Sequence, residues 1–163
     1  MSTHILGLHV NPNGGVPKHP VDALVITKKG CVGDKQNDLK HHGGPQKAVC
    51  IMLDSVLQLL KELGHPIGPG TTGENILLNG IQSDGIDTGS MLSFTNGVVL
   101  EITGPAPPCK TIRSSFLDNE FTALSHKLIS GQTRWYASVI TPGSVVLGEE
   151  AQVVNESEQV ESP

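Results

Sequence analysis

The chain has 163 residues, a length typical of one domain that buries a core without disulfides or structural metals. Only 3% of the residues are aromatic, whereas glycine and proline contribute 19 and 11 residues, which favours short strands and many turns over a helix bundle. No apolar run is long enough to span a membrane and no signal peptide is apparent, so we expect a cytoplasmic protein that does not bind membranes.

The net charge of −5 is concentrated at the C-terminus. Residues 149–163 contain five glutamates and no basic residue, while residues 1–148 hold eleven acidic and eleven basic side chains. We therefore predict one domain over residues 1–154 and an acidic, disordered tail over residues 155–163. No basic face with interleaved aromatic residues is present, which argues against nucleic-acid binding.

Three cysteines, Cys31, Cys50 and Cys109, are spaced widely along the chain. An odd number without a Cys-x-x-Cys pair is typical of free thiols in a reducing compartment. An iron–sulfur cluster usually requires four thiolates, so we expect no cluster of the protein's own.

The first elements predicted are two strands and a glycine-rich turn. Apolar residues alternate over residues 4–10, and a second strand is predicted over residues 21–27. The turn between them ends at Lys18, whose ammonium and neighbouring backbone N–H groups would suit a phosphate. A plain connecting loop explains the same turn and is the simpler interpretation.

Groups capable of chemistry are concentrated next in Cys31, Asp34, His41 and His42. Their spacing matches no standard zinc motif, and adjacent histidines on an extended chain point to opposite sides. A zinc site is the first interpretation of this set, and these observations argue against it. Surface histidines in a glycine-hinged loop are the interpretation that we prefer.

A buried strand and a helix are predicted in the middle of the chain. The apolar run over residues 48–53 places Cys50 in the core. A helix capped by Asp54 or Ser55 follows and ends near Gly64. Its predicted apolar stripe consists of Val56, Leu59, Leu60 and Leu63.

A second glycine-punctuated turn over residues 69–75 carries Thr72, Glu74 and Asn75. These side chains suit hydrogen bonding to a polar ligand or to the backbone of the turn itself. The turn opens onto the apolar residues 76–78. Strands are predicted over residues 91–95 and 98–103, and Asn96-Gly97 between them predicts a hairpin.

A proline-rich segment over residues 104–109 ends at Cys109. Three prolines fix φ and lack N–H groups, so we expect a rigid loop rather than a helix or a central strand. Such a loop presents a thiol to a soft metal or an electrophile, although an inert cysteine in a connection is also compatible with the pattern.

The C-terminal part is predicted to hold a helix from Asp118 or Asn119 to Ile129 and strands over residues 137–140 and 144–147. The chain's two arginines, Arg113 and Arg134, lie on either side of that helix. Arginine can hold an oxyanion with two hydrogen bonds, and an ordinary surface position is the alternative for each.

Taken together, these segments resemble the MOSC domain, the module named after the C-terminal part of molybdenum cofactor sulfurases. The resemblance extends over residues 4 to about 154 and rests on the order of the set rather than on any single motif. The matching segments are residues 14–18, 30–34, 41–44, 73–76, 103–109 and 134–136.

The resemblance implies a mostly β (α+β), barrel-like fold with a few short helices and binding of the molybdenum cofactor. Cys109 matches the family's characteristic cysteine, as a ligand of molybdenum or a carrier of sulfur. Other pocket residues follow by extension: Lys18, Arg113 and Arg134 for the phosphate, Thr72 and Asn75 for the pterin, and Asp34 with His41 or His42 as a proton relay.

Three functions remain open from the sequence. The first is a cofactor-binding protein that supports reduction of N-hydroxylated compounds with an external electron donor. The second is a sulfur carrier with a persulfide on Cys109, and the third is a storage or delivery protein for apo-molybdoenzymes. The chain has no room for an iron–sulfur or desulfurase domain, so electrons or sulfur must come from a partner, and the oligomeric state stays open.

Overall fold

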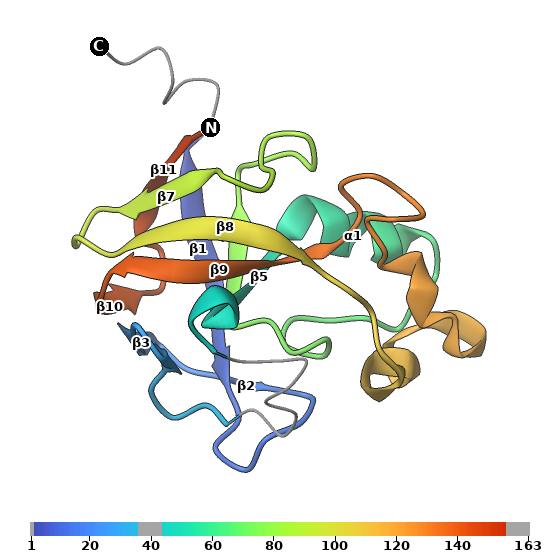
Figure 1. Cartoon of the computed structure of the whole chain (residues 1–163). Coiled ribbons are helices and arrows are strands. Elements are labelled where there is room, and N and C mark those ends of the chain that lie inside the picture. The colour runs from blue at the N-terminus through green and yellow to red at the C-terminus, as the bar shows by residue number, and fades with distance from the viewer. Residues whose placement is uncertain (1, 36–43, 156–163) are drawn as a thin grey trace.

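The computed structural model describes residues 2–35 and 44–155. His41 and His42 lie outside these residues, as does most of the predicted acidic tail. The described chain is mostly β, as the sequence predicts, with short helices between the strands (Figure 1).

The main sheet closes on itself. Its spatial order is β11, β7, β8, β9, β5, β6, β1, and pairing of Thr3 on β1 with Ala151 on β11 joins the two ends (Figure 1). Closure leaves these strands without an open edge along the paired segments. The strands are β1 (Thr3–Val10), β5 (Val49–Leu53), β6 (Ile76–Asn79), β7 (Met91–Phe94), β8 (Val99–Ala106), β9 (Arg134–Thr141) and β11 (Glu150–Val154).

Short strands extend this barrel at one end. β2 (His19–Pro20) pairs with the end of β1, while β3 (Ala23–Thr27), β4 (Gly30–Cys31) and β10 (Gly143–Val146) form a small second sheet. These strands position the loops that carry Lys18 and Asp34.

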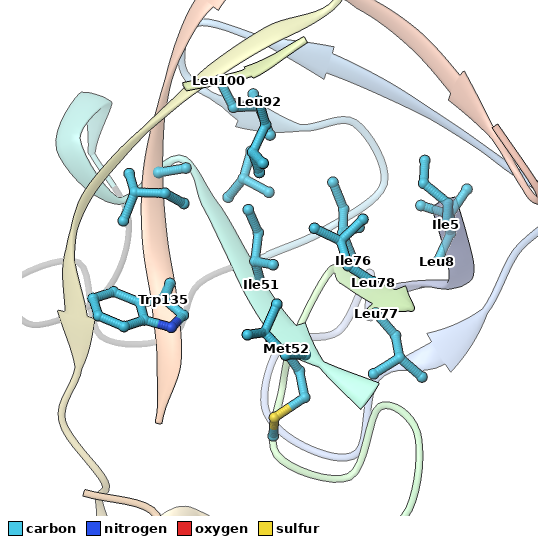
Figure 2. Close-up of a cluster of buried hydrophobic side chains, with 14 of the residues drawn as sticks. Ile5, Leu8, Ile51, Met52, Ile76, Leu77, Leu78, Leu92, Leu100 and Trp135 are labelled. Carbon is cyan, nitrogen blue, oxygen red and sulfur yellow. The ribbon is translucent and has the colours of Figure 1, made fainter. Parts of the chain in front are cut away.

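The core fills the barrel with aliphatic side chains from nearly every strand. Ile51 on β5 and Ile76 on β6 are paired across the sheet and lie in the centre of this cluster (Figure 2). Every residue of β5 is buried, because the barrel interior covers one face and other elements cover the outer face. The predicted buried strand with Cys50 in the core is therefore confirmed.

The predicted helix forms as α1 (Asp54–Glu62), and its predicted apolar stripe is confirmed for Val56 and Leu60 but wrong for Leu59 and Leu63. Val56, Leu57 and Leu60 are buried, whereas Leu59 and Leu63 are 43% and 58% exposed. Leu63 is the C-cap and lies beyond the helix, and the buried face is centred on Leu57 rather than on Leu59.

The hairpin at Asn96-Gly97 is confirmed by pairing of β7 with β8. The prediction of a loop from Gly104 onward was wrong for its first residues, because β8 continues to Ala106 and pairs Pro105 with Trp135. β7 pairs with β8 only as far as Glu101, so Pro105 lies where one side of β8 has no partner strand for its missing N–H.

The continuous helix predicted from Asp118 to Ile129 is absent from the described chain. Two 3-10 segments overlap its range, η3 (Leu117–Asn119) and η4 (Phe121–Ala123), and a third, η2 (Lys110–Ser115), precedes them. Asp118 and Asn119 have φ of 52° and 58°, in the left-handed region that interrupts a right-handed helix. A further short segment, η1 (Pro45–Lys47), precedes β5. None of the helices in the described ranges is long and apolar enough to cross a membrane.

The acidic C-terminal stretch begins inside the fold rather than as a tail. Glu149 is buried, and its carboxylate accepts hydrogen bonds from the Asn96 backbone, the Asn96 side chain and the Val146 backbone. The following residues form β11, which closes the barrel.

Candidate functional site

A buried ion pair joins two of the residues that the sequence singled out. The Lys18 ammonium lies 2.6 Å from the Asp34 carboxylate, and both side chains are 5% exposed. Lys18 follows the first glycine-rich turn and Asp34 follows β4, so the small strands at the end of the barrel bring the two loops together. The turn is more than a plain connection, because it places a charged group in the interior.

Asn75 bonds the same Asp34 oxygen as Lys18 does. Its amide donates to Asp34 at 2.9 Å and to the His9 carbonyl at 3.2 Å, while its oxygen accepts from the Cys50 backbone at 3.0 Å. The Asn11 backbone N–H donates to the second Asp34 oxygen at 2.9 Å. Lys18, Asp34 and Asn75 thus form one network, in which Asn75 is completely buried and acts by positioning Asp34.

Arg134 is the second buried cation of this region. Its guanidinium is 4% exposed and donates to the carbonyls of Thr72, at 2.8 Å, and Pro107, at 3.0 Å. Its Nε has no hydrogen-bond partner, and no carboxylate of the described chain lies within ion-pair distance. A buried positive charge with an unused donor lowers the stability of the fold unless an anion pairs with it and accepts that hydrogen bond.

Glu74 completes the polar interior beside Arg134. Its carboxylate accepts from the Gly70 backbone at 2.7 Å and from the Thr72 hydroxyl at 2.9 Å, and both Glu74 and Thr72 are completely buried. The sequence left open whether these side chains bond a ligand or the turn itself. These contacts fit hydrogen bonding within the turn, because the Thr72 hydroxyl donates to Glu74. Burial lowers the pKa of the neighbouring His9, although Glu74 acts in the opposite direction.

Cys109 lies two residues beyond the carbonyl that Arg134 holds. It immediately precedes η2, is half-buried, and has its sulfur 2.7 Å from the Thr111 hydroxyl. The bond from Arg134 to Pro107 ties the end of the proline segment to β9. The loop that presents the thiol is therefore anchored to the buried guanidinium as well as stiffened by its prolines.

The other two thiols differ from Cys109 in their surroundings. Burial raises the pKa of Cys50, which lies in a small apolar group with Ala106 and Tyr136, and Arg134 opposes that shift. Burial, assisted by Asp34, raises the pKa of Cys31 to about 12. Cys31 and Asp34 line a pocket of about 160 Å³, so this thiol is protonated where it meets solvent.

Not every predicted site residue joins these networks. Arg113 is exposed and donates to the Lys110 carbonyl at 2.9 Å, so it stands apart from the buried groups. His41 and His42 fall outside the described residues. The described residues that join are Lys18, Asp34, Thr72, Asn75, Arg134 and, through Pro107, the loop with Cys109.

Several participants gave no signal in the sequence. Some of them act through backbone atoms, which do not depend on residue type. These are the carbonyls of Pro107 and Thr72 and the N–H of Asn11. Thr111 follows Cys109 by two residues and its hydroxyl could have been noticed from that spacing. His9 gave no pattern beyond a histidine within a predicted strand.

Comparisons with known proteins identify the family of this chain. A family model described as "MOSC domain" matches residues 38–152. The chain is 27% identical to uncharacterized protein YflK of Bacillus subtilis over 147 residues, and 27% identical to protein YiiM of Escherichia coli over 136 residues. These alignments cover 89% and 80% of this chain but only 65% and 59% of the relatives, so both relatives are longer than the region they share with it.

A solved structure of similar size shows the same fold. YuaD protein from Bacillus subtilis superposes with a TM-score of 0.76 at 19% sequence identity, covering 94% of this chain and 96% of that one. At this identity the likeness concerns the fold alone.

Proposed function

This chain belongs to the MOSC domain family, and from that premise we propose that it binds the molybdenum cofactor with Cys109 as a ligand of the molybdenum. The ligand would meet Arg134 through its phosphate and the sulfur of Cys109 through its metal. The family supplies the class of ligand, and the described residues supply the test of whether such a ligand fits.

The observation that carries the proposal is the buried Arg134 guanidinium, which forms no ion pair with a described carboxylate and has an unpaired Nε. The side chain is buried, its Nε has no partner, and its other two nitrogens bond only to neutral carbonyls. A phosphate offers the missing counter-charge and acceptor, and arginine holds phosphate more strongly than neutral acceptors. Because the Pro107 carbonyl shares this guanidinium, a ligand bound there would lie close in the fold to the Cys109 loop.

Lys18 acts differently from Arg134 in this proposal. Its ammonium is already paired with Asp34 and holds that carboxylate in place, so it is not available to a further anion. Asn75 and the Asn11 backbone fix both oxygens of the same carboxylate. Asp34 is thereby a rigid proton acceptor at the edge of the pocket that it shares with Cys31.

Cys109 supplies the thiolate expected of a molybdenum ligand. Soft metals prefer sulfur, and the contact with Thr111 holds the sulfur in one orientation. When bound, the cofactor supplies two-electron oxygen-atom transfer, which no amino-acid side chain performs alone. The protein's part is to position the group and to control its proton supply.

The finer activity is reduction of N-hydroxylated compounds with electrons from a donor protein. We place the protein in the cytoplasm, since its three cysteines are free thiols. A reduction assay with N-hydroxylated amidines, with and without a reductant, tests this activity once the cofactor has been detected.

The decisive experiment is the molybdenum and pterin content of protein purified from a molybdenum-replete host. We expect about one of each per chain in the wild type, and loss of at least the molybdenum in Cys109→Ser. Cys31→Ser is the matched control, because it makes the same change at another half-buried thiol and should retain the metal.

Two outcomes would overturn the proposal. Full molybdenum occupancy in Cys109→Ser would remove Cys109 as the ligand. A wild type without metal or pterin that carries one added sulfur on Cys109 by mass spectrometry would replace cofactor binding by sulfur transfer.

A further inference from the structure

A second pocket is lined by residues of β1, β2, β6 and the first half of α1, together with residues of the loops between the strands. Its volume is about 440 Å³, within the range of small-molecule sites. It contains neither Cys109 nor Arg134, so it is separate from the site of the proposed function. Part of its wall is exposed apolar surface, contributed by Leu6 and Leu147, and Val21 is half-buried beside them.

His9 lines this pocket and has an unused polar atom. The side chain is 3% exposed and its Nδ1 has no hydrogen-bond partner. Burial lowers the pKa of His9, so the ring is neutral near pH 7 and carries one acceptor nitrogen. A buried polar group without a partner is rare in folded proteins and points to a ligand or water that completes it.

Gly7 makes room for this ring. It lies at an irregularity of β1 pairing, and a Cβ there would approach His9 Cε1 to 2.9 Å. Glycine within a strand often marks such a close approach. The absence of a side chain at Gly7 therefore leaves space for the His9 imidazole beside the pocket.

The charges of the lining have one sign. Asp22 and Asp54 line the pocket, and no lysine or arginine of the described ranges does. Neither carboxylate is in an ion pair with another described residue, although Gln58 donates to Asp54 at 3.2 Å. The described residues contain no group of three or more His, Cys, Asp or Glu side chains arranged for a metal ion, which favours an organic cation over a bare metal.

We propose that this pocket is a second binding site, for a small organic cation that combines an ammonium group with an apolar body. The ammonium meets Asp22 and Asp54 and offers a hydrogen bond to the free nitrogen of His9. The apolar body covers Leu6 and Leu147, which are otherwise exposed to water, and the half-buried Val21.

The test is a titration of the full chain with benzylammonium. Binding is measured by calorimetry and by the NMR signals of Gly7 and of the His9 ring. We expect saturable binding with shifts at these residues, and at least tenfold weaker binding of the neutral analogue benzyl alcohol. The double variant Asp22→Asn with Asp54→Asn should weaken benzylammonium binding by a similar factor. Asp84→Asn, at an exposed carboxylate outside the pocket, is the control and should bind as the wild type does.

Three results would overturn this inference. They are equal affinity for the two analogues, no saturable binding below about 10 mM, and shifts centred on Cys109 instead of β1. Should the double variant fail to fold, the comparison of the two analogues on the wild type still decides the question. Neither the comparison of analogues nor that of variants depends on molybdenum. If benzylammonium does not bind, the proposed function is therefore unaffected.

Discussion

At the scale of single residues, the two buried cations have different partners. Lys18 lies in an ion pair whose carboxylate has further hydrogen bonds, whereas Arg134 bonds to carbonyls only. A buried ion pair is costly to break on one side, because the remaining charge keeps its desolvation cost. The first pair therefore serves positioning, and the second cation is the one that we propose pairs with a phosphate.

Asp34→Asn should destabilise the protein by about 3 kcal/mol, because it leaves the Lys18 ammonium buried without a counter-charge. Urea denaturation measures this change. The control is Asp84→Asn on the surface, with an expected change within about 0.5 kcal/mol. Adding Lys18→Met to Asp34→Asn should recover part of the loss, and a loss equal to the sum of the two single variants would show that the pair is not coupled.

The three thiols should differ in reactivity with iodoacetamide. Cys109 should be alkylated first near pH 8, because burial raises the pKa of Cys50 and of Cys31 and keeps both protonated. Since the pKa of Cys31 is about 12, its rate should keep increasing with pH up to that value, by about tenfold per pH unit. Peptide mass spectrometry gives each rate, and a plateau for Cys31 near pH 9 would contradict the assignment.

At the scale of elements, β8 shows how a strand accommodates a proline-rich sequence. Its pairing with β9 shifts register between Ile102 and Gly104. On its other side, strand pairing with β7 ends at Glu101, and backbone hydrogen bonds to Gly89 and Ser90 continue only to Ile102. The irregularity and the open side remove the need for the missing N–H of Pro105. The consequence is that β8 runs directly into the segment with Cys109, which is joined to the barrel rather than hanging from a loose loop.

Two glycines of β8 and its hairpin should respond differently to alanine. Gly97→Ala should cost about 1 kcal/mol, because φ is 108° there although no atom lies within 4 Å of the added Cβ. Gly104→Ala has equal space and no positive φ, so it should be neutral or slightly stabilising. Thermal unfolding of both variants compares backbone strain without a steric difference, and equal losses would refute the explanation.

At the scale of the whole molecule, β11 holds the barrel closed. It pairs with β7 on one side and β1 on the other, and Glu149 just before it secures the turn of the β7–β8 hairpin. Without this strand, β1 and β7 would each present an unpaired edge. Closure thus depends on the last described residues of the chain.

Ending the chain after Gly148 should abolish cooperative unfolding and promote aggregation, because two edges open at once. Ending it after Asn155 removes none of the described strand pairs and should keep a cooperative transition. Circular dichroism melts and size-exclusion chromatography distinguish the two truncations. A cooperative, monodisperse product of the shorter chain would show that the barrel does not need β11.

The sequence by itself determined the positions of most strands, the hairpin at Asn96-Gly97, the helix after β5 and the family. Alternation, turn residues and capping act between near neighbours, so they can be read locally. The same local signals failed at Asp118, where the backbone is left-handed, and at Pro105, which joins a strand. In both cases the outcome depends on what lies beside the segment in space.

Only the tertiary structure decided which of the candidate residues meet. Asp34 and Asn75 are 41 residues apart, and Arg134 and Thr72 are 62 apart, so their contacts exist because the closed sheet brings their strand ends together. The partners of Arg134 are backbone carbonyls, which leave no trace in residue identity. Residue types predicted which chemical groups the chain contains. The pairing of distant strands decided which charges are buried and which of them has no counter-ion among the described residues.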